Sequence, residues 1–231
     1  MVVINLDTEL ISVIIPVYNE EESLSALFTR LFSVMYDISH EIIFINDGSK
    51  DKSLSILQNE QKNNSCMKVI DMGGNYGQHR AIMKGFEQCT GDLIITMDAD
   101  LQNPPEEIPR IISEYKHGHD VIGTIRMNRQ DTFFRKTASH IVNRMTNMIT
   151  GFHISDYGCM LRGYSRDIVT EMLKVKRDDI FIPALAQKLA HNPVEIEISH
   201  SEREYGESKY SFYRLIKLFM SLIRTAYIAR R

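Results

Sequence analysis

The chain has 231 residues, of which 43% are hydrophobic and 25% charged, and its formal net charge is −3 at pH 7. This is the composition of a globular protein, and it excludes a disordered chain. The length gives room for one α/β domain of ordinary to large size or for two small domains. The small negative charge gives no indication of a nucleic-acid binder, and three cysteines without CxxC spacing argue against a disulfide framework or a zinc site.

Buried strands alternate with helices along the chain. Strands are predicted at 11–16, 41–47, 68–72, 92–97 and 120–124, where apolar or β-branched runs end in polar turns. Helices are predicted at 20–35, 53–61, 78–89 and 105–115, with Ser49 as a cap of the second and proline near the start of the fourth. This alternation predicts a mostly parallel sheet that is covered by helices on both faces.

Polar or glycine-rich segments follow all five predicted strands. In chain order they read PVYNE, NDGS, GGNYGQH, DADLQ and RMNRQD. One polar loop is an ordinary feature of any surface, but ligands of open parallel sheets bind outside the carboxyl ends of the strands. Five such segments in succession therefore predict a ligand cleft at this edge of the sheet.

Two carboxylates, Asp98 and Asp100, directly follow the fourth strand. In an extended segment they would point the same way, and Gln102 would continue that parity. Two carboxylates and an amide oxygen suit Mg²⁺ or Mn²⁺, which takes further ligands from water and substrate phosphates. One alternative is a pair of solvated loop acids. Another is a phosphatase of the haloacid dehalogenase type, but that family has Thr or Val at the position of Gln102 and usually carries this strand near the N-terminus.

Several segments in a set order carry a resemblance to a known family: VIIPVYNEEESL, NDGSKDKS, NYGQHRAIMKGF, DADLQNPPEEIP and EREYGESKYSF. They resemble the family 2 GT-A glycosyltransferases that load sugars onto polyprenyl phosphates, such as dolichyl-phosphate mannose synthase. The likeness covers about residues 10–220, and its details look most similar to the members that transfer 4-deoxy-4-formamido-L-arabinose. It implies an α/β GT-A fold over residues 1–208, with a mostly parallel central sheet and helices on both faces.

The resemblance also implies a reaction. We expect an inverting transfer from a UDP-sugar, with UDP-4-deoxy-4-formamido-L-arabinose as the first expectation, to undecaprenyl phosphate with Mg²⁺ or Mn²⁺ as cofactor. In the members that transfer 4-deoxy-4-formamido-L-arabinose, the reaction serves lipid A modification and polymyxin resistance at the cytoplasmic face of the bacterial inner membrane. Glucosyl or mannosyl transfer to a polyprenyl phosphate is one alternative, and a nucleotide-sugar-binding module without turnover is another. Homo-oligomerisation stays open, and no nucleic-acid partner is expected.

The donor side of the site is assigned by the resemblance. The nucleotide pocket would be lined by Pro16, Tyr18 and Glu20, and Asp47 would hold the uracil or the ribose. The residues expected around the metal and the diphosphate are Asp98, Asp100, Gln102, Arg203 and Lys209. His79, at a predicted helix start, either touches the donor or caps the helix.

The acceptor side is assigned in the same way. Arg126, Arg135 and Ser139 would receive the lipid phosphate, which is already anionic at pH 7 and needs little or no general base. Asp156 lies in a motif that lines the acceptor side, where it is either a base or the structural partner of Arg162 or of an acceptor-site arginine.

Two positions depart from the family pattern. Many relatives have Asp-Asp-Gly-Ser where this chain has Asn46 before Asp47, and many have Arg where this chain has Gly74. Asn keeps a hydrogen bond but not a charge, so we expect a minor change in nucleotide contact at Asn46. At Gly74 we expect one positive charge fewer near the phosphates.

The segment 209–231 holds six basic residues and no acidic one. Its apolar residues fall on one helical face and its basic residues on the other, which predicts an amphipathic helix that lies on an anionic membrane surface. A helix packed on the sheet is the alternative. The N-terminus shows no signal-peptide pattern and no window reaches 18 uninterrupted apolar residues, so we expect peripheral attachment rather than a spanning helix.

Overall fold

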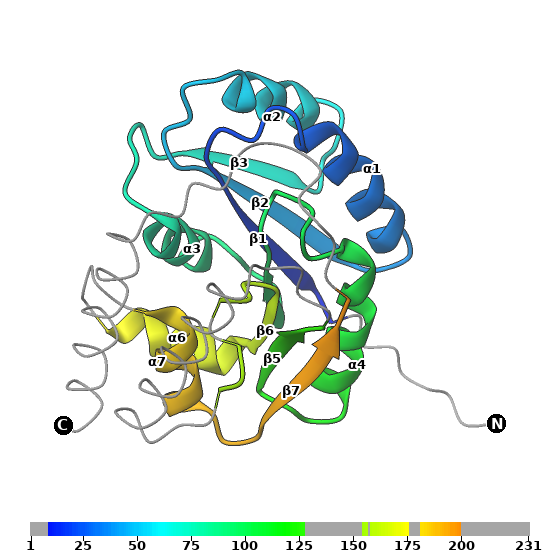
Figure 1. Ribbon diagram of the computed structural model, residues 1–231, viewed down its shortest axis with the longest axis vertical. Coiled ribbons are helices and arrows are strands. Elements are labelled where there is room, and N and C mark those ends of the chain that lie inside the picture. Colours follow the sequence, from blue (N-terminus) through cyan, green and yellow to red (C-terminus); the bar gives the residue numbers. More distant parts are fainter. Residues whose placement is uncertain (1–8, 128–153, 157, 176–180, 200–231) are drawn as a thin grey trace.

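A computed structural model describes residues 9–127, 154–156, 158–175 and 181–199 of the chain (Figure 1). Its centre is a seven-stranded sheet in the order β3-β2-β1-β4-β6-β5-β7. The strands are β1 Ile11–Val17, β2 His40–Asn46, β3 Met67–Asp71, β4 Leu93–Thr96, β5 Val121–Arg126, β6 Arg162–Ser165 and β7 Pro193–Ile198. Among these strands β6 alone runs antiparallel to its neighbours, so β1 to β5 all end at one edge of the sheet.

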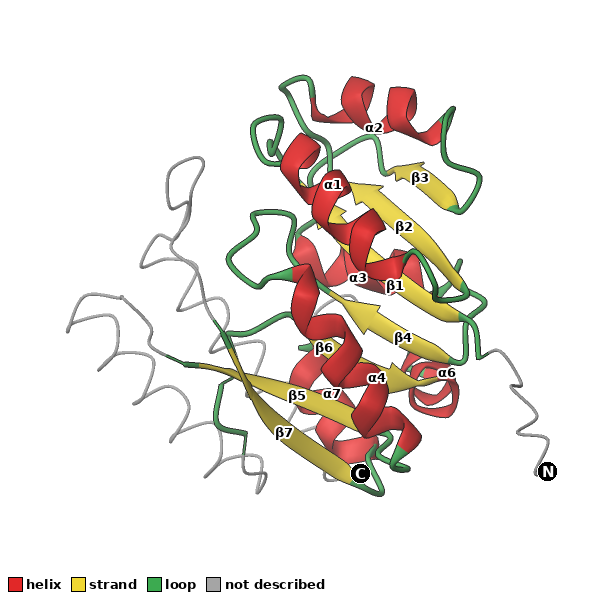
Figure 2. Ribbon diagram, turned by 90° about the vertical axis from the view of Figure 1, so that its right-hand side faces the viewer, coloured by secondary structure: helices red, strands yellow, loops and turns green. Residues whose placement is uncertain are grey.

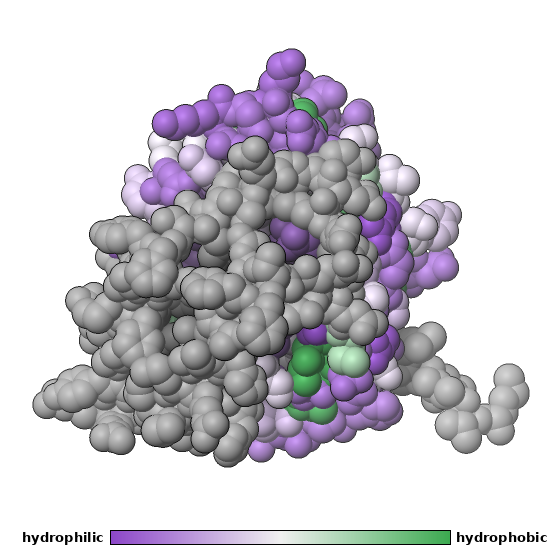
Figure 3. Space-filling model, in the orientation of Figure 1, coloured by the Kyte–Doolittle hydropathy of each residue, from purple (hydrophilic) through white to green (hydrophobic). Residues whose placement is uncertain are grey.

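Helices cover both faces of the sheet (Figure 2). One face carries α1 Leu24–Met35, α2 Ser53–Gln61, the short 3₁₀ helix η1 Pro105–Glu107 and α4 Ile108–Lys116. The other carries α3 Gln78–Phe86, α6 Arg166–Lys174 and α7 Ile182–Leu189. The surface over α1 and α2 is mostly hydrophilic in Figure 3, as expected of helices that bury one face only.

The core consists of two apolar layers, one on each side of the sheet. Along β1, Val13 and Ile15 point into the layer beneath α1 and α4, whereas Ile14 points into the layer beneath α3 and α6. All three side chains are 0% exposed. Burial on both faces explains why β1 reads as a continuous apolar run rather than an alternating one.

The predicted strands and helices are confirmed, with shifted ends. The first helix begins at Leu24, later than predicted, because residues 21–23 form a turn, and α3 ends at Phe86. β6 and β7 were not predicted: β6 is a four-residue strand with the sequence RGYS, and β7 is a half-exposed edge strand.

The C-terminal prediction lies outside the described residues. The structure therefore does not test the helix at 209–231 or the boundary after residue 208. Among the helices that are described, none combines the length and the apolar character needed to cross a bilayer.

Candidate active site

The loops after β1 and β2 are hydrogen-bonded into one unit at the carboxyl edge of the sheet. The Asn19 amide donates to Ser49 Oγ at 3.0 Å, and the Lys50 amide donates to Asn19 Oδ1 at 2.7 Å. The Glu20 amide donates to Ser53 Oγ at 2.9 Å. The prediction that Ser49 caps α2 is therefore wrong, because its hydroxyl holds the first loop instead. The predicted nucleotide residues Pro16 and Tyr18 lie partly buried where β1 ends and this unit begins.

Asp47 connects this unit to the loop after β3. It is 4% exposed, and its two carboxylate oxygens accept the amide hydrogens of Tyr76 at 2.7 Å and Gly77 at 2.9 Å. Burial raises the pKa of Asp47, and the two backbone hydrogen bonds oppose that rise. Asp47 thus positions the loop 73–77, and each oxygen retains acceptor capacity for a ligand.

Asp98 lies just past the end of β4 and is partly buried. Gln78, the first residue of α3, donates from Nε2 to Asp98 Oδ1 at 2.5 Å. Burial and then the negative charge of Asp100 raise the pKa of Asp98 from 3.8 to about 7, although the positive charge of Arg126 opposes them. Glu20 adds a further negative charge, so residues from the ends of β1, β3, β4 and β5 converge on this carboxyl group.

The chain turns sharply after Asp98 instead of staying extended. Leu101 adopts a φ of 61°, which is unusual for a residue other than glycine, and its side chain is 2% exposed. The Gln102 amide donates to Asp100 Oδ1 at 3.2 Å within this turn. The premise of an extended segment from 98 to 102 is therefore wrong. Asp98 and Asp100 are nevertheless close enough for their charges to interact.

Arg126 and Asp156 form a bidentate ion pair at the end of β5. Nε of Arg126 lies 2.7 Å from Asp156 Oδ2, and its Nη2 lies 2.9 Å from Oδ1. Burial lowers the pKa of Arg126, but the hydrogen bonds and the charge of Asp156 outweigh it and raise the pKa overall. Arg162, only 2% exposed, donates to the carbonyl oxygens of Asp156 and Cys159, so the alternative of an Asp156–Arg162 side-chain pair is not what the structure contains.

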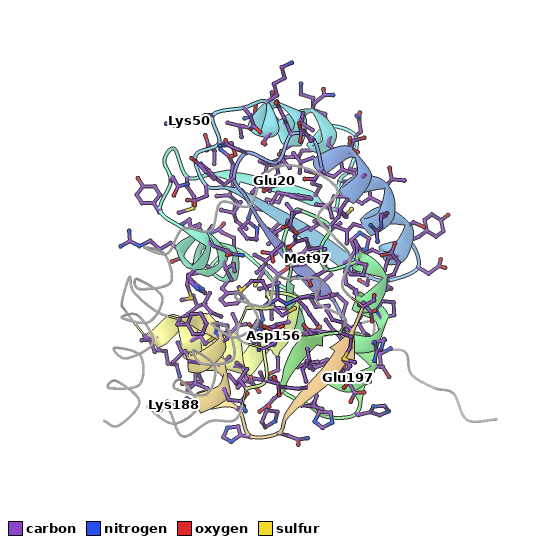
Figure 4. All side chains as sticks on the ribbon, in the orientation of Figure 1. Glu20, Lys50, Met97, Asp156, Lys188 and Glu197 are labelled. Atoms are coloured by element: carbon purple, nitrogen blue, oxygen red, sulfur yellow. The ribbon has the colours of Figure 1, made fainter. Side chains whose placement is uncertain are left out.

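These groups lie along the centre of the molecule. In Figure 4, Glu20, Met97 and Asp156 follow one another from the β2 side of the sheet towards β5. The site therefore spans the parallel strand ends, with Asp47 and Glu20 on one side and the Arg126–Asp156 pair on the other.

The residues present fit a divalent cation. Burial and the negative charges of Asp100 and Glu20 raise the cost of ionising Asp98, and a bound cation would lower that cost. In the part of the chain that the structure describes, no group of three or more His, Cys, Asp and Glu side chains is arranged to hold a metal. A metal here would take its other ligands from an amide oxygen, water and phosphate oxygens, as Mg²⁺ often does.

Gln78 rather than its neighbour His79 makes the hydrogen bond to a site carboxylate. Among the described residues Nδ1 of His79 has no hydrogen-bond partner, the ring packs edge-on against Phe181, and burial lowers its pKa to about 4. His79 does not cap α3, which begins after Gly77. Gln78 was missed, although its place directly after the third strand's glycine-rich loop could have indicated it.

Four predicted site residues lie outside the described residues: Arg135, Ser139, Arg203 and Lys209. The structure thus brings together Glu20, Asp98, Asp100, Arg126 and Asp156, whereas Gln102 contributes a backbone contact to the turn.

Comparison with known proteins assigns this arrangement to a family. Residues 12–173 match the family model for glycosyl transferase family 2, which is most of the chain. The chain belongs to this family. It is 52% identical over 217 residues to an undecaprenyl-phosphate 4-deoxy-4-formamido-L-arabinose transferase of Photorhabdus laumondii subsp. laumondii. The match covers 92% of this chain and 66% of that transferase, so the chain spans just under two thirds of its length.

Solved structures confirm the GT-A fold expected from the sequence. Glucosyl-3-phosphoglycerate synthase from Mycobacterium tuberculosis, in complex with Mn²⁺ and UDP-glucose, superposes with a TM-score of 0.69 at 13% identity over 97% of this chain and 80% of that one. S. aureus TarS 1-349, in complex with UDP-GlcNAc, superposes with a TM-score of 0.59 at 19% identity over 92% of this chain and 66% of that one. At these identities the likeness concerns the fold alone.

Proposed function

We propose that this protein transfers a sugar from a UDP-sugar to undecaprenyl phosphate with inversion, and that the sugar is 4-deoxy-4-formamido-L-arabinose. The observation that carries the proposal is the turn with Asp98 and Asp100 at the carboxyl edge of the sheet. It occurs in a chain that is 52% identical to an undecaprenyl-phosphate 4-deoxy-4-formamido-L-arabinose transferase. A metal-bound diphosphate is typically held through one or two carboxylates, and this turn would supply both.

The donor would lie across the ends of β1, β2 and β4. Asp98, Asp100 and the oxygen of Gln102 would hold the metal and the diphosphate, and Pro16, Tyr18, Glu20 and Asp47 would contact the nucleoside. When bound, the metal would stabilise the negative charge that develops on the leaving diphosphate. The complex of the mycobacterial synthase with Mn²⁺ and UDP-glucose is consistent with a metal of this kind.

The acceptor would be held by Arg126, Arg135 and Ser139. A phosphate monoester is anionic at pH 7, so it attacks without a strong base once arginines hold its other oxygens. Both oxygens of Asp156 are engaged by Arg126, which supports a positioning role for Asp156 over that of a general base. Arg203 and Lys209 would contact the donor phosphates.

The reaction would take place at the cytoplasmic face of a bacterial inner membrane, where it would serve lipid A modification. This location is part of the proposal. It rests on the 52% identical transferase, which is named after undecaprenyl phosphate, a lipid phosphate. The basic segment 209–231 would add attraction to an anionic surface.

A transfer assay tests the proposal. The protein is incubated with undecaprenyl phosphate in detergent, Mn²⁺ or Mg²⁺, and a panel of UDP-sugars that includes UDP-4-deoxy-4-formamido-L-arabinose and UDP-glucose. We expect a lipid-linked product with the first sugar and no product in EDTA. A product with UDP-glucose alone would overturn the sugar assignment, and clear UDP binding without any product would indicate a binding module.

A further inference from the structure

Asn46, the last residue of β2, connects two loops at the nucleotide side of the site. It is 1% exposed, and its Nδ2 donates to Asp71 Oδ1 at 2.8 Å, while its Oδ1 accepts the Ser49 amide at 3.2 Å. Asp71 is its direct partner on β3 in the parallel register. The same Asp71 oxygen also accepts the Gly73 amide at 3.1 Å. One buried amide therefore links the loop after β2 to the start of the loop after β3.

The two loops also touch along their backbones. A Cβ on Gly48, whose φ is +69°, would lie 2.5 Å from the Gly74 carbonyl carbon, so the loops are too close for any side chain between them. Asp47 closes the far end through the amides of Tyr76 and Gly77. The loop 73–77 is thus held from its start by Asn46 and from its end by Asp47.

An amide is required at position 46 by this geometry. The Asp71 carboxylate can only accept, so the side chain at position 46 must donate to it, and the Ser49 amide needs an acceptor. Asn offers both in one side chain, whereas Asp offers acceptors only. A carboxylate at position 46 would place two negative charges at hydrogen-bonding distance with no proton between them.

We propose that Asn46 and Asp71 form a positioning pair that orders the loop 73–77 and thereby sets the affinity of the site for the nucleotide of the donor. This inference rests on the proposed function for the identity of its ligand. It also gives a physical meaning to the Asn-Asp-Gly-Ser sequence. The Asn of this sequence donates a hydrogen bond to an Asp on the neighbouring strand, so the two residues belong together.

A charge-swap series tests the pair. Asn46→Asp should raise the Kd for UDP, measured by calorimetry with Mn²⁺, roughly tenfold, which equals about 1.4 kcal/mol and is the size of one lost hydrogen bond. Asp71→Asn alone should change the Kd by less than about threefold, because the amide oxygen that it introduces can still accept from Asn46 and Gly73. The double variant N46D/D71N should return to within about threefold of the wild type, since the amide introduced on β3 can donate to the carboxylate introduced on β2.

Hydrogen–deuterium exchange of the amides of Gly73, Tyr76 and Gly77 gives a second readout that needs no ligand. These amides should exchange roughly tenfold faster in Asn46→Asp and return to wild-type rates in the double variant. If the wild type binds no UDP, the proposed function fails, and the exchange rates still decide whether the pair orders the loop.

The matched control is Asn64→Asp. Asn64 also donates from Nδ2 to a carboxylate, Glu60 Oε1, at 2.6 Å, but it lies at the opposite edge of the sheet, before β3. It should leave both readouts unchanged. The proposal is overturned if Asn46→Asp has wild-type Kd and exchange rates, or if adding Asp71→Asn restores neither. Should Asn46→Asp not fold, recovery of folding in the double variant supports the pair, and its continued failure to fold overturns it.

Discussion

Replacing Asp98 by Asn should stabilise the metal-free protein at alkaline pH. The carboxyl group is partly buried and close to the charge of Asp100, so its ionised form is unfavourable in the folded state. Asn is nearly isosteric, and its Oδ1 can still accept the hydrogen bond from Gln78. The substitution therefore removes the charge and keeps the contact.

The magnitude follows from the pKa of Asp98, which is raised from 3.8 to about 7. Between these values the folded protein holds a proton that the unfolded chain has lost, so stability falls as the pH rises, and the loss is complete above about pH 7. A rise of this size corresponds to about 4 kcal/mol. Because solvent reaches part of the group, we expect Asp98→Asn to gain about 2–3 kcal/mol at pH 8 and less than about 1 kcal/mol at pH 4.

Urea unfolding in EDTA at the two pH values measures this difference. Asp37→Asn is the control, because Asp37 is exposed, and its substitution should change the free energy of unfolding by less than about 0.5 kcal/mol at either pH. Equal effects of Asp98→Asn at pH 4 and pH 8, or a loss of stability at pH 8, would refute the assignment of Asp98 as a carboxylate held in an unfavourable state.

Two further substitutions test the frame of the site. Asp156→Asn should lower the free energy of unfolding by about 3 kcal/mol in urea, because it leaves the Arg126 guanidinium, whose side chain is 13% exposed, without its charged partner; an effect below about 1 kcal/mol would contradict a buried pair. Gly48→Ala should cost about 2–4 kcal/mol, because its Cβ meets the Gly74 backbone at a φ of +69°. Gly118→Ala, with a φ of +91° and nothing within 4 Å, isolates the backbone strain and should cost about 1 kcal/mol; equal costs for both would contradict the close approach of the loops.

The sheet edge was predictable from the sequence because it depends on local patterns. β1 to β4 are short apolar runs, and each ends in residues that suit a turn, so the convergence of their loops follows from a parallel sheet. The carboxylates Asp98 and Asp100 were found for the same reason: they follow such a run directly.

One backbone turn and several contacts between distant segments were not predictable in this way. The turn at Leu101 depends on a left-handed backbone that leucine rarely adopts, and nothing local in the sequence indicates it. The hydrogen bond from Gln78 to Asp98 joins the start of α3 to the end of β4. The hydrogen bond from Asn46 to Asp71 depends on the register of β2 and β3. β6 has no apolar run to reveal it, since it begins at Arg162, whose buried side chain donates to the carbonyl oxygens of Asp156 and Cys159.

The central claim is that Asp98 and Asp100 bind a metal and the diphosphate of a UDP-sugar together. Calorimetry of UDP binding with Mn²⁺ and with EDTA, on the wild type and on Asp100→Asn, tests this claim most directly. We predict that Mn²⁺ tightens UDP binding to the wild type at least about tenfold and that Asp100→Asn, although folded, loses this gain. Equal UDP affinity in Mn²⁺ and in EDTA, or an undiminished Mn²⁺ effect in Asp100→Asn, would contradict the account.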